Sequence, residues 1–235
     1  MNVEVYADAG AVAQKAAAFV ADEARTAIAA RGRFVFAVSG GHTPWLMLRA
    51  LAGEALPWEA VHIVQVDERV ALEGDSDRNL THLRESLVEL TAVHVHAMPV
   101  EAADLGAAAA QYAATLQAIA GSPPVLDLVH LGLGPDGHTA SLVPGDAVLR
   151  VSDADVALTD VYNGRRRMTL TYPILNRSRR VLWLVTGDDK ADMVGRLCAG
   201  DTSIPAGRVL KDRALVLADR AAARVVSGSA ARSSE

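Results

Sequence analysis

Short apolar runs alternate with helix-like stretches along almost the whole chain, and this alternation restricts the fold more than any other feature. Four runs are nearly uninterrupted hydrophobic sequence: RFVFAVS (33–39), VHIVQV (61–66), LDLVHLGL (126–133) and RVLWLVT (180–186). Strands that are apolar on both faces are typical of parallel sheets that helices cover on both sides. The pattern therefore predicts an α/β protein built on a mostly parallel, doubly covered sheet.

The remaining expected elements fill the intervals between these runs. Helices are expected over 9–31, 44–52, 79–90, 104–120 and 188–199, with a short one from Pro173, and further strands over 93–98, 167–172 and 214–219. No linker-like segment or internal repeat divides the series, so we expect one domain over residues 1–226. The tail SGSAARSSE, residues 227–235, is expected to be disordered.

Charge and composition exclude several classes of protein. The chain of 235 residues is 51% hydrophobic, enough for a sizeable core, and its formal net charge of −5 argues against general nucleic-acid binding. The single cysteine, Cys198, suits a reducing compartment. The N-terminal sequence lacks the apolar region of a secretory signal, and no run is long enough to span a bilayer. We expect a cytoplasmic protein with no nucleic-acid or membrane partner.

The segment LDLVHLGLGPDGHTASLVPG, residues 126–145, carries the strongest chemical signal. Its apolar strand ends in a glycine-rich turn that delivers Asp136 and His138 two positions apart. Ligands of α/β proteins bind where strands end, and a histidine there can titrate near neutral pH and act as a base. The alternative is a tight turn with a solvated histidine. The density of Gly, Asp and His in the turn favours a function.

A second glycine-rich turn, Ser39-Gly40-Gly41-His42-Thr43-Pro44, joins the strand at 33–39 to a helix. Thr43 fits the N-cap and Pro44 the first helical position. Free backbone N–H groups and the helix dipole at such a turn form an anion site. The turn is neither a Walker loop nor GxGxxG, so the common nucleotide fingerprints are absent. The alternative is a plain capped turn, and the anion argument does not need His42.

Charged residues stand at three further strand ends. Asp67-Glu68-Arg69 follows the strand 61–66, Arg167 begins the strand 167–172, and Lys190 follows the strand 180–186. Parallel strands gather their carboxyl ends along one edge, so these groups can share a crevice with both turns. Asn79, at an expected helix start, can face the same crevice. The alternatives are surface ion pairs and solvated charge runs.

His94 and His96 form an H-x-H pair, which raises the question of a metal site. No third ligand of suitable spacing stands nearby in the sequence, and alternation along a strand places both rings on one face. We therefore expect no metal.

Together these motifs resemble the 6-phosphogluconolactonase family, in the same order along almost the whole chain. SGGHTP is similar to the family's SGG-[ST]-TP loop, VDERV with DSDRN to its DER and D-x-N segments, and LGLGPDGHTASLVPG to its most specific motif. RRMTLTYPILNRSRRVLWLVTGDDK resembles its R-x-T-[LM]-T strand, its N-helix and its V-TG-x-x-K element, and ALVLADRAAA resembles its closing strand and helix. The resemblance implies a Rossmann-like sheet of the glucosamine-6-phosphate deaminase and ribose-5-phosphate isomerase type, without a bound dinucleotide.

The resemblance also implies an activity, the hydrolysis of 6-phosphoglucono-δ-lactone in the oxidative pentose phosphate pathway, with no metal or organic cofactor. His138 would be the general base, with Asp136 orienting it or facing away. The substrate-binding residues it implies are Ser39, Gly40, Gly41, Thr43, Asp67, Arg69, Arg167 and Lys190. The expected assembly is a monomer or a weak homo-oligomer. Departures from the family's pattern are modest: His42 replaces a small polar residue, Val143 replaces Phe, and the last strand lacks an aromatic residue.

Two rival functions remain. The glucosamine-6-phosphate deaminase relatives typically carry an FNEP-like sequence after the DGH, whereas this chain has Ala140-Ser141-Leu142-Val143-Pro144, without the acid. A non-catalytic sugar-phosphate sensor is the second rival, and such regulators carry a DNA-binding module. Here about thirty residues are expected before the first strand, as a single helix, and His138 is present.

Overall fold

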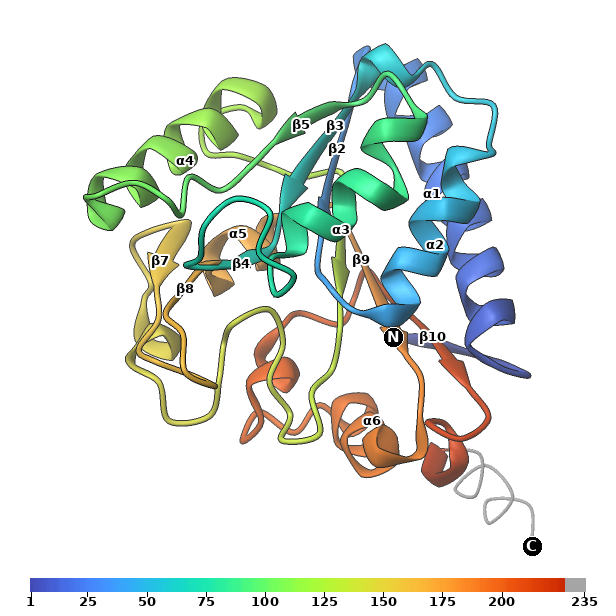
Figure 1. The fold of residues 1–235 in the computed structure, drawn as a ribbon. Coiled ribbons are helices and arrows are strands. Elements are labelled where there is room, and N and C mark those ends of the chain that lie inside the picture. The colour runs from blue at the N-terminus through green and yellow to red at the C-terminus, as the bar shows by residue number, and fades with distance from the viewer. Residues whose placement is uncertain (227–235) are drawn as a thin grey trace, which may run out of the picture.

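Seven parallel strands form the central sheet, as the apolar runs predict. The computed structural model describes residues 1–226, and the strand order in this sheet is β1-β10-β9-β6-β2-β3-β5 (Figure 1). The strands are β1 (Asn2–Tyr6), β2 (Phe34–Val38), β3 (Val61–Gln65), β5 (His94–His96), β6 (Leu128–Leu131), β9 (Arg180–Val185) and β10 (Ala214–Asp219). All neighbouring pairs in this sheet run parallel.

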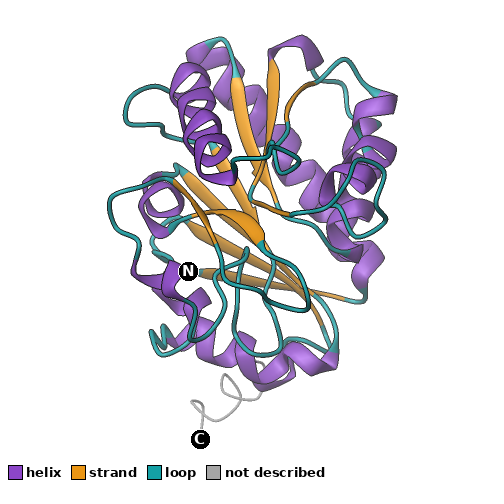
Figure 2. Cartoon of the chain, turned by 60° about the vertical axis from the view of Figure 1, so that its left-hand side comes forward, coloured by secondary structure: helices purple, strands orange, loops and turns teal. Residues whose placement is uncertain are grey.

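Helices cover both faces of the sheet (Figure 2). They are α1 (Ala9–Arg31), α2 (His42–Ala52), α3 (Asn79–Ser86), α4 (Leu105–Ala120), α5 (Tyr172–Arg177) and α6 (Ala191–Ala199). Phe34, Phe36 and Val38 pack with α1, α2 and α3, whereas Val35 and Ala37 pack with α4, α5 and α6. Successive side chains of a strand point to opposite faces, so β2 is buried on both. The predicted doubly covered sheet is confirmed.

A small antiparallel sheet of order β4-β8-β7 lies beside the central one. It consists of β4 (Asp67–Arg69), β7 (Val156–Leu158) and β8 (Arg167–Leu170). The strand expected over 167–172 therefore ends earlier, at Leu170, and pairs with β4 and β7 instead of joining the parallel sheet. Neither β4 nor β7 was expected from the sequence.

Three further boundaries differ from the sequence-based expectation. A strand, β1, precedes the first helix, so the expectation that a single helix fills the chain before the first strand is wrong. Helix α2 begins at His42 with Gly41 as its N-cap residue, so Thr43 is not the cap. The helix expected over 79–90 ends at Ser86 and is followed by a 3-10 turn, Val88–Leu90.

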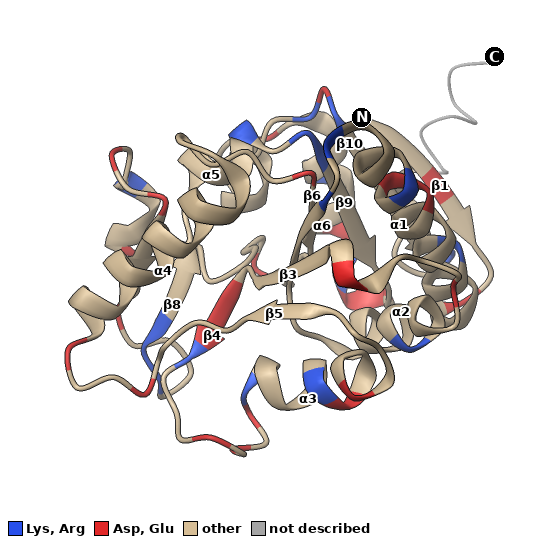
Figure 3. Ribbon diagram, turned by 90° about the horizontal axis from the view of Figure 1, so that it is seen from above, with Lys and Arg blue, Asp and Glu red and all other residues tan. Residues whose placement is uncertain are grey.

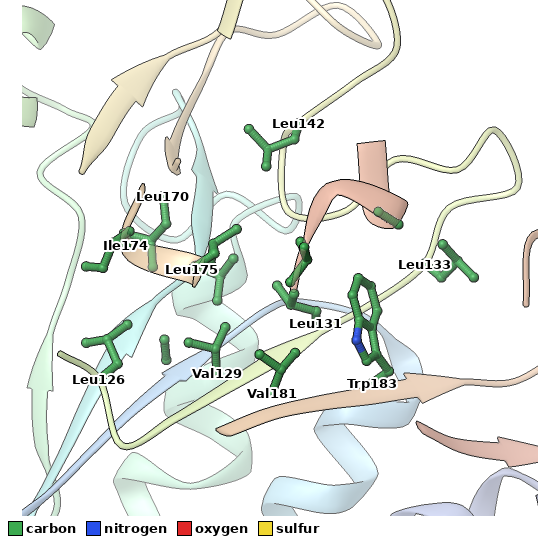
Figure 4. Close-up of a cluster of buried hydrophobic side chains, with 14 of the residues drawn as sticks. Leu126, Val129, Leu131, Leu133, Leu142, Leu170, Ile174, Leu175, Val181 and Trp183 are labelled. Carbon is green, nitrogen blue, oxygen red and sulfur yellow. The ribbon is translucent and has the colours of Figure 1, made fainter. Parts of the chain in front are cut away.

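The apolar core supports the strand end from which the turn containing His138 departs. In Figure 4, Val129 and Leu131 point from β6 toward Leu175, and Trp183 lies next to Leu131. All four side chains have no exposed surface. Burial of each such side chain contributes roughly 1.5–3 kcal/mol. The start of the turn is therefore fixed by the core.

The strand order places two glycine-rich turns side by side. Strands β2 and β6 are neighbours, and the sheet continues from β2 to β3 on one side and from β6 to β9 on the other. Such a reversal of strand order opens a crevice at the carboxyl ends of the two strands.

Within residues 1–226, no helix combines the length and the hydropathy that a membrane crossing needs. The tail expected to be disordered, residues 227–235, lies outside the described residues.

Candidate active site

A cleft of about 190 Å³ opens where β2 and β6 end. It collects segments that are far apart in the sequence, from the turns after β2 and β6 to strands β4 and β8 and the start of α3. Its lining residues are Ser39, Gly40, Asp67, Arg69, Asn79, Gly132, Leu133, Gly134, Pro135, His138, Ala140, Arg167 and Lys190. An adjoining hollow shares Gly40 and Lys190 with it and is lined also by Gly41, His42 and Thr43.

The imidazole of His138 is held by the carboxylate of Asp136. Nδ1 of His138 lies 2.6 Å from Oδ1 of Asp136, and the backbone N–H of His138 donates to the same oxygen at 3.1 Å. Burial raises the pKa of Asp136, but these hydrogen bonds and the nearby imidazole outweigh it and hold the pKa below its usual value. An ionised carboxylate only accepts, so Nδ1 of His138 is the nitrogen that donates to it, and in the neutral ring Nε2 is the acceptor.

Two glycines allow this turn to form. Gly137, between Asp136 and His138, has φ of 82°, in the left-handed region that favours glycine. A Cβ at Gly134 would collide with the His138 ring. The turn is therefore built around the position of the imidazole.

Two hydrogen bonds to His130 on β6 anchor the turn that follows β2. The backbone N–H of Ser39 donates to Nδ1 of His130 at 3.2 Å, and the Ser39 hydroxyl donates to the His130 carbonyl at 3.1 Å. Next to it, Gly40 packs so closely on Asn79 that a Cβ would collide with the side-chain oxygen. Backbone N–H groups at a helix start favour anions, and α2 begins two residues later.

The cleft is lined by three cationic side chains, Arg69, Arg167 and Lys190, and by one carboxylate, Asp67. Figure 3 shows the acidic strand β4 beside β8, which begins with Arg167. Asp67 accepts from the Ser141 hydroxyl at 2.6 Å and lies 4.0 Å from the Arg167 guanidinium. Burial lowers the pKa of Arg167, and the charge of Asp67 opposes this effect. Lys190 lies 3.2 Å from Asp189. The cleft is thus cationic within a chain of net negative charge.

Glu68, which has no exposed surface, joins β4 to the start of α3. Its carboxylate accepts from the backbone N–H groups of Asn79 and Leu80, each at 2.8 Å, and from that of Arg69 at 2.9 Å. A negative charge at a helix N-terminus is stabilising. Arg69 in turn donates to the side-chain oxygen of Asn79, which fixes both groups at the cleft wall.

The structure brings together most residues singled out from the sequence. Ser39, Gly40, Asp67, Arg69, His138, Arg167 and Lys190 line the cleft, and so does Asn79. Gly41 and Thr43 line the adjoining hollow instead, where the Thr43 hydroxyl lies 2.8 Å from that of Thr186. Asp136 lies behind His138, outside the set of lining residues. The sequence patterns assigned no role to Ser141 or Tyr162, which contact Asp67 and His138 respectively.

His94 and His96 lie on the edge strand β5, two strands from β2, and neither lines this cleft. Both stack on His62 of β3, so the two rings share one face as expected, and Nδ1 of His62 lies 3.0 Å from Nε2 of His96. Burial, followed by the neighbouring imidazoles, lowers the pKa of His62. Among residues 1–226, no group of three or more His, Cys, Asp or Glu side chains is arranged to hold a metal ion.

The doubly wound sheet and its cleft define a Rossmann-like protein with a cationic, histidine-bearing site at the switch point of the strand order. The chain belongs to the family described as glucosamine-6-phosphate isomerases/6-phosphogluconolactonase, whose model matches residues 7–217.

Curated relatives of the chain include a 6-phosphogluconolactonase of Mycobacterium tuberculosis, 37% identical over 239 residues that cover 94% of this chain and 97% of the relative. A 6-phosphogluconolactonase of Synechocystis is 37% identical over 205 residues, 84% of this chain and 85% of the relative. The solved structure of 6-phosphogluconolactonase from Thermotoga maritima has a TM-score of 0.82 at 24% identity, covering 93% and 98% of the two chains.

A monomeric glucosamine-6-phosphate deaminase has a similar TM-score of 0.83, at 21% identity, covering 96% of this chain and 100% of its own. The fold is therefore common to both branches of the family, and the fold alone does not separate lactonase from deaminase.

Proposed function

We propose that this chain hydrolyses 6-phosphoglucono-δ-lactone to 6-phosphogluconate, the lactonase step of the oxidative pentose phosphate pathway. The observation that carries the proposal is the His138–Asp136 pair in a cleft with three cations. Relatives with 37% identity that carry the name 6-phosphogluconolactonase support the same activity.

In the proposed mechanism, Nε2 of His138 takes a proton from water while the water oxygen attacks C1 of the lactone. The carbonyl electrons move onto the C1 oxygen. When the tetrahedral intermediate collapses, the bond from C1 to the ring oxygen breaks and that oxygen takes the proton from the imidazolium. Asp136 holds the ring in the tautomer that this step needs and stabilises its positive charge.

The phosphate group is proposed to lie against the turn that contains Gly40 and Gly41, between Arg167 and Lys190. Within the described residues, Nε of Arg167 is buried without a hydrogen-bond partner, and a bound phosphate would provide one. Binding the phosphate at one end of the cleft positions C1 beside His138 at the other. Asp67 is proposed to orient Arg167 and does not contact the reacting atoms.

A cytoplasmic location and a monomeric or weakly associating chain belong to the same proposal. The free thiol of Cys198 suits a reducing compartment.

A direct assay tests the proposal. Purified protein is expected to release acid from freshly generated lactone far faster than the spontaneous background, equally well after EDTA treatment, and to release no ammonia from glucosamine 6-phosphate.

The role of the phosphate group is tested with a second substrate and a variant. Unphosphorylated gluconolactone is expected to be a poor substrate. Arg167→Met is expected to raise KM for the phosphorylated lactone, and the exposed Arg49→Met serves as the matched control. Ammonia release at a comparable rate, or equal kcat/KM for both lactones, would overturn the proposal. Tight sugar-phosphate binding without turnover would instead favour a sensor.

A further inference from the structure

The loop that joins β7 to β8 contains a tight turn, and this turn fixes the backbone position of Tyr162. Asn163 and Gly164 have φ of 50° and 77°, and Tyr162 and Arg165 form a bridge on either side of them. Positive φ at both central residues is typical of type I′ turns, which Asn-Gly favours. The backbone position of Tyr162 is therefore determined by the turn.

Tyr162 contacts residues at both ends of the proposed site, the reacting end and the phosphate-binding end. Its ring meets the His138 imidazole edge to face, with centroids 5.7 Å apart and planes at 65°. Its hydroxyl donates to Oδ2 of Asp136 at 3.4 Å, the oxygen that His138 does not use. The Arg167 guanidinium carbon lies 5.1 Å from the centroid of the same ring. A single side chain thus contacts the proposed base, the residue that orients it and a proposed phosphate ligand.

Ion pairs tie the tip of the hairpin to the segment that leads into α3. Arg165 lies 3.0 Å from a carboxylate oxygen of Asp75 and 3.1 Å from one of Asp77, both in the loop between β4 and α3. Tyr162 does not itself line the cleft. The turn and these ion pairs together hold the ring against His138 and Arg167.

We propose that Tyr162 is a positioning residue that sets the orientation of His138 and of Arg167 together, and so couples the reacting end of the site to the phosphate end. The inference rests on the proposed function for its kinetic consequences. Edge-to-face aromatic contacts and cation–π contacts are attractive and directional, so their loss frees both partners to rotate. The weak hydroxyl contact is secondary to the ring.

Two substitutions separate the ring from the hydroxyl. Tyr162→Leu is expected to lower kcat and to raise KM for the lactone, each by about three- to tenfold, whereas Tyr162→Phe stays within about threefold of the parent in both. Tyr6→Leu is the matched control, since Tyr6 is a half-buried tyrosine on the far edge strand β1. It is expected to leave kcat and KM unchanged.

Double-mutant cycles identify the contacts. The effect of Tyr162→Leu on KM is expected to shrink when Arg167 is already Lys, and its effect on kcat to shrink when Asp136 is already Asn. Effects of the two substitutions on kcat and KM that simply multiply in the double mutants would overturn the inference. It would also be overturned if Tyr6→Leu changed kcat and KM as much as Tyr162→Leu does, or if Tyr162→Leu kept the parental kcat and KM.

Nuclear magnetic resonance gives a readout that does not depend on turnover. The ring-proton signals of His138, assigned by comparison with His138→Gln, are expected to shift in Tyr162→Leu and to stay near the parental positions in Tyr162→Phe. If the parent fails to hydrolyse the lactone but these shifts occur, the proposed function fails while the positioning role stands. If the parent hydrolyses the lactone and the His138 ring-proton signals do not shift in Tyr162→Leu, the positioning role is wrong.

Discussion

The proton on the His138 ring is placed by a residue two positions earlier in the chain. Asp136 accepts from both the backbone and the ring of His138, so the neutral ring is held in the tautomer with its proton on Nδ1. The pairing of an acid and an imidazole across one glycine was visible in the sequence. Whether Asp136 faced the ring or faced away was not, because that depends on the φ of Gly137.

Replacement of the ring tests this arrangement. His138→Gln is expected to lower kcat by about a hundredfold or more while the fold persists, since glutamine fills similar space but cannot accept a proton. Steady-state kinetics with the lactone, together with a thermal melt, measures both effects. His82→Gln, a change on the outer side of α3 away from the cleft lining, serves as the control and should keep parental kcat. A well-folded His138→Gln enzyme with most of its kcat would rule His138 out as the base.

A second histidine makes the stability of the protein depend on pH. Burial lowers the pKa of His130 to about 3, far below the value near 6.5 of an unfolded chain. Between these values the unfolded state binds the extra proton, so stability is lost as pH falls below about 6.5. The parent is expected to lose roughly 1.4 kcal/mol per pH unit from this group. Urea titrations from pH 7.5 to 5 should therefore be less pH-dependent in His130→Gln, and equal slopes would contradict the assignment.

At the scale of elements, two of the three strands that the sequence did not predict, β1 and β4, depend on partners distant in the sequence, while the third, β7, pairs with the nearby β8. β4 consists of Asp67, Glu68 and Arg69, a triplet without apolar character, and it forms because β8 pairs with it and Glu68 caps α3. β1 is an edge strand whose neighbour, β10, lies at the other end of the described chain. The apolar central strands were predictable because burial on both faces leaves no other choice of residue.

The residues of the site can also be divided into those that the sequence predicted and those that it did not. Residues that follow central strands, such as Ser39 and His138, could be placed in one cleft because parallel strands end on one edge. Ser141 and Tyr162 act through the small antiparallel sheet, which was not expected. Asn163-Gly164 was the available signal for its hairpin, since this pair is typical of tight β-turns.

The contact between the turn after β2 and helix α3 makes Gly40 sensitive to substitution. Gly40→Ala places a Cβ against the side-chain oxygen of Asn79, so Asn79 must move and Arg69 loses its partner. We expect kcat/KM to fall by about tenfold or more, a typical cost of misplacing binding groups. Gly53→Ala is the control, because Gly53 has φ of −82° and its Cβ would make only an ordinary contact. Similar activity in the two variants would show that the close packing at Gly40 is unimportant.

For the whole molecule, the two apolar cores share one sheet. Residues of β2, β9 and β10 contribute to both cores, so neither can form without the strands of the other. The shared sheet supports the prediction of a single domain, for which the sequence offered only the lack of a linker-like segment.

We therefore expect a single unfolding transition. Trp183 belongs to one core, while Trp45 and Trp58 pack against the other, so tryptophan fluorescence can report each face separately. In urea, variants that retain only Trp183 or only Trp45 should each show coincident fluorescence and far-ultraviolet circular dichroism transitions. Two separate midpoints, one for each face, would indicate independent folding units.

The pairing of β1 with β10 has a consequence for the order of events during synthesis. Residues 2–6 leave the ribosome long before their partner strand, Ala214–Asp219, which is separated from them by almost all of the described chain. Until it emerges, β1 has no neighbour in the sheet, and the helix α1 that follows must wait with part of its apolar face uncovered, since it packs on β9 and β10 as well as on β2. A nascent chain would therefore leave β1 and part of α1 accessible to chaperones until β10 is made, and the arrival of β10 would complete the sheet.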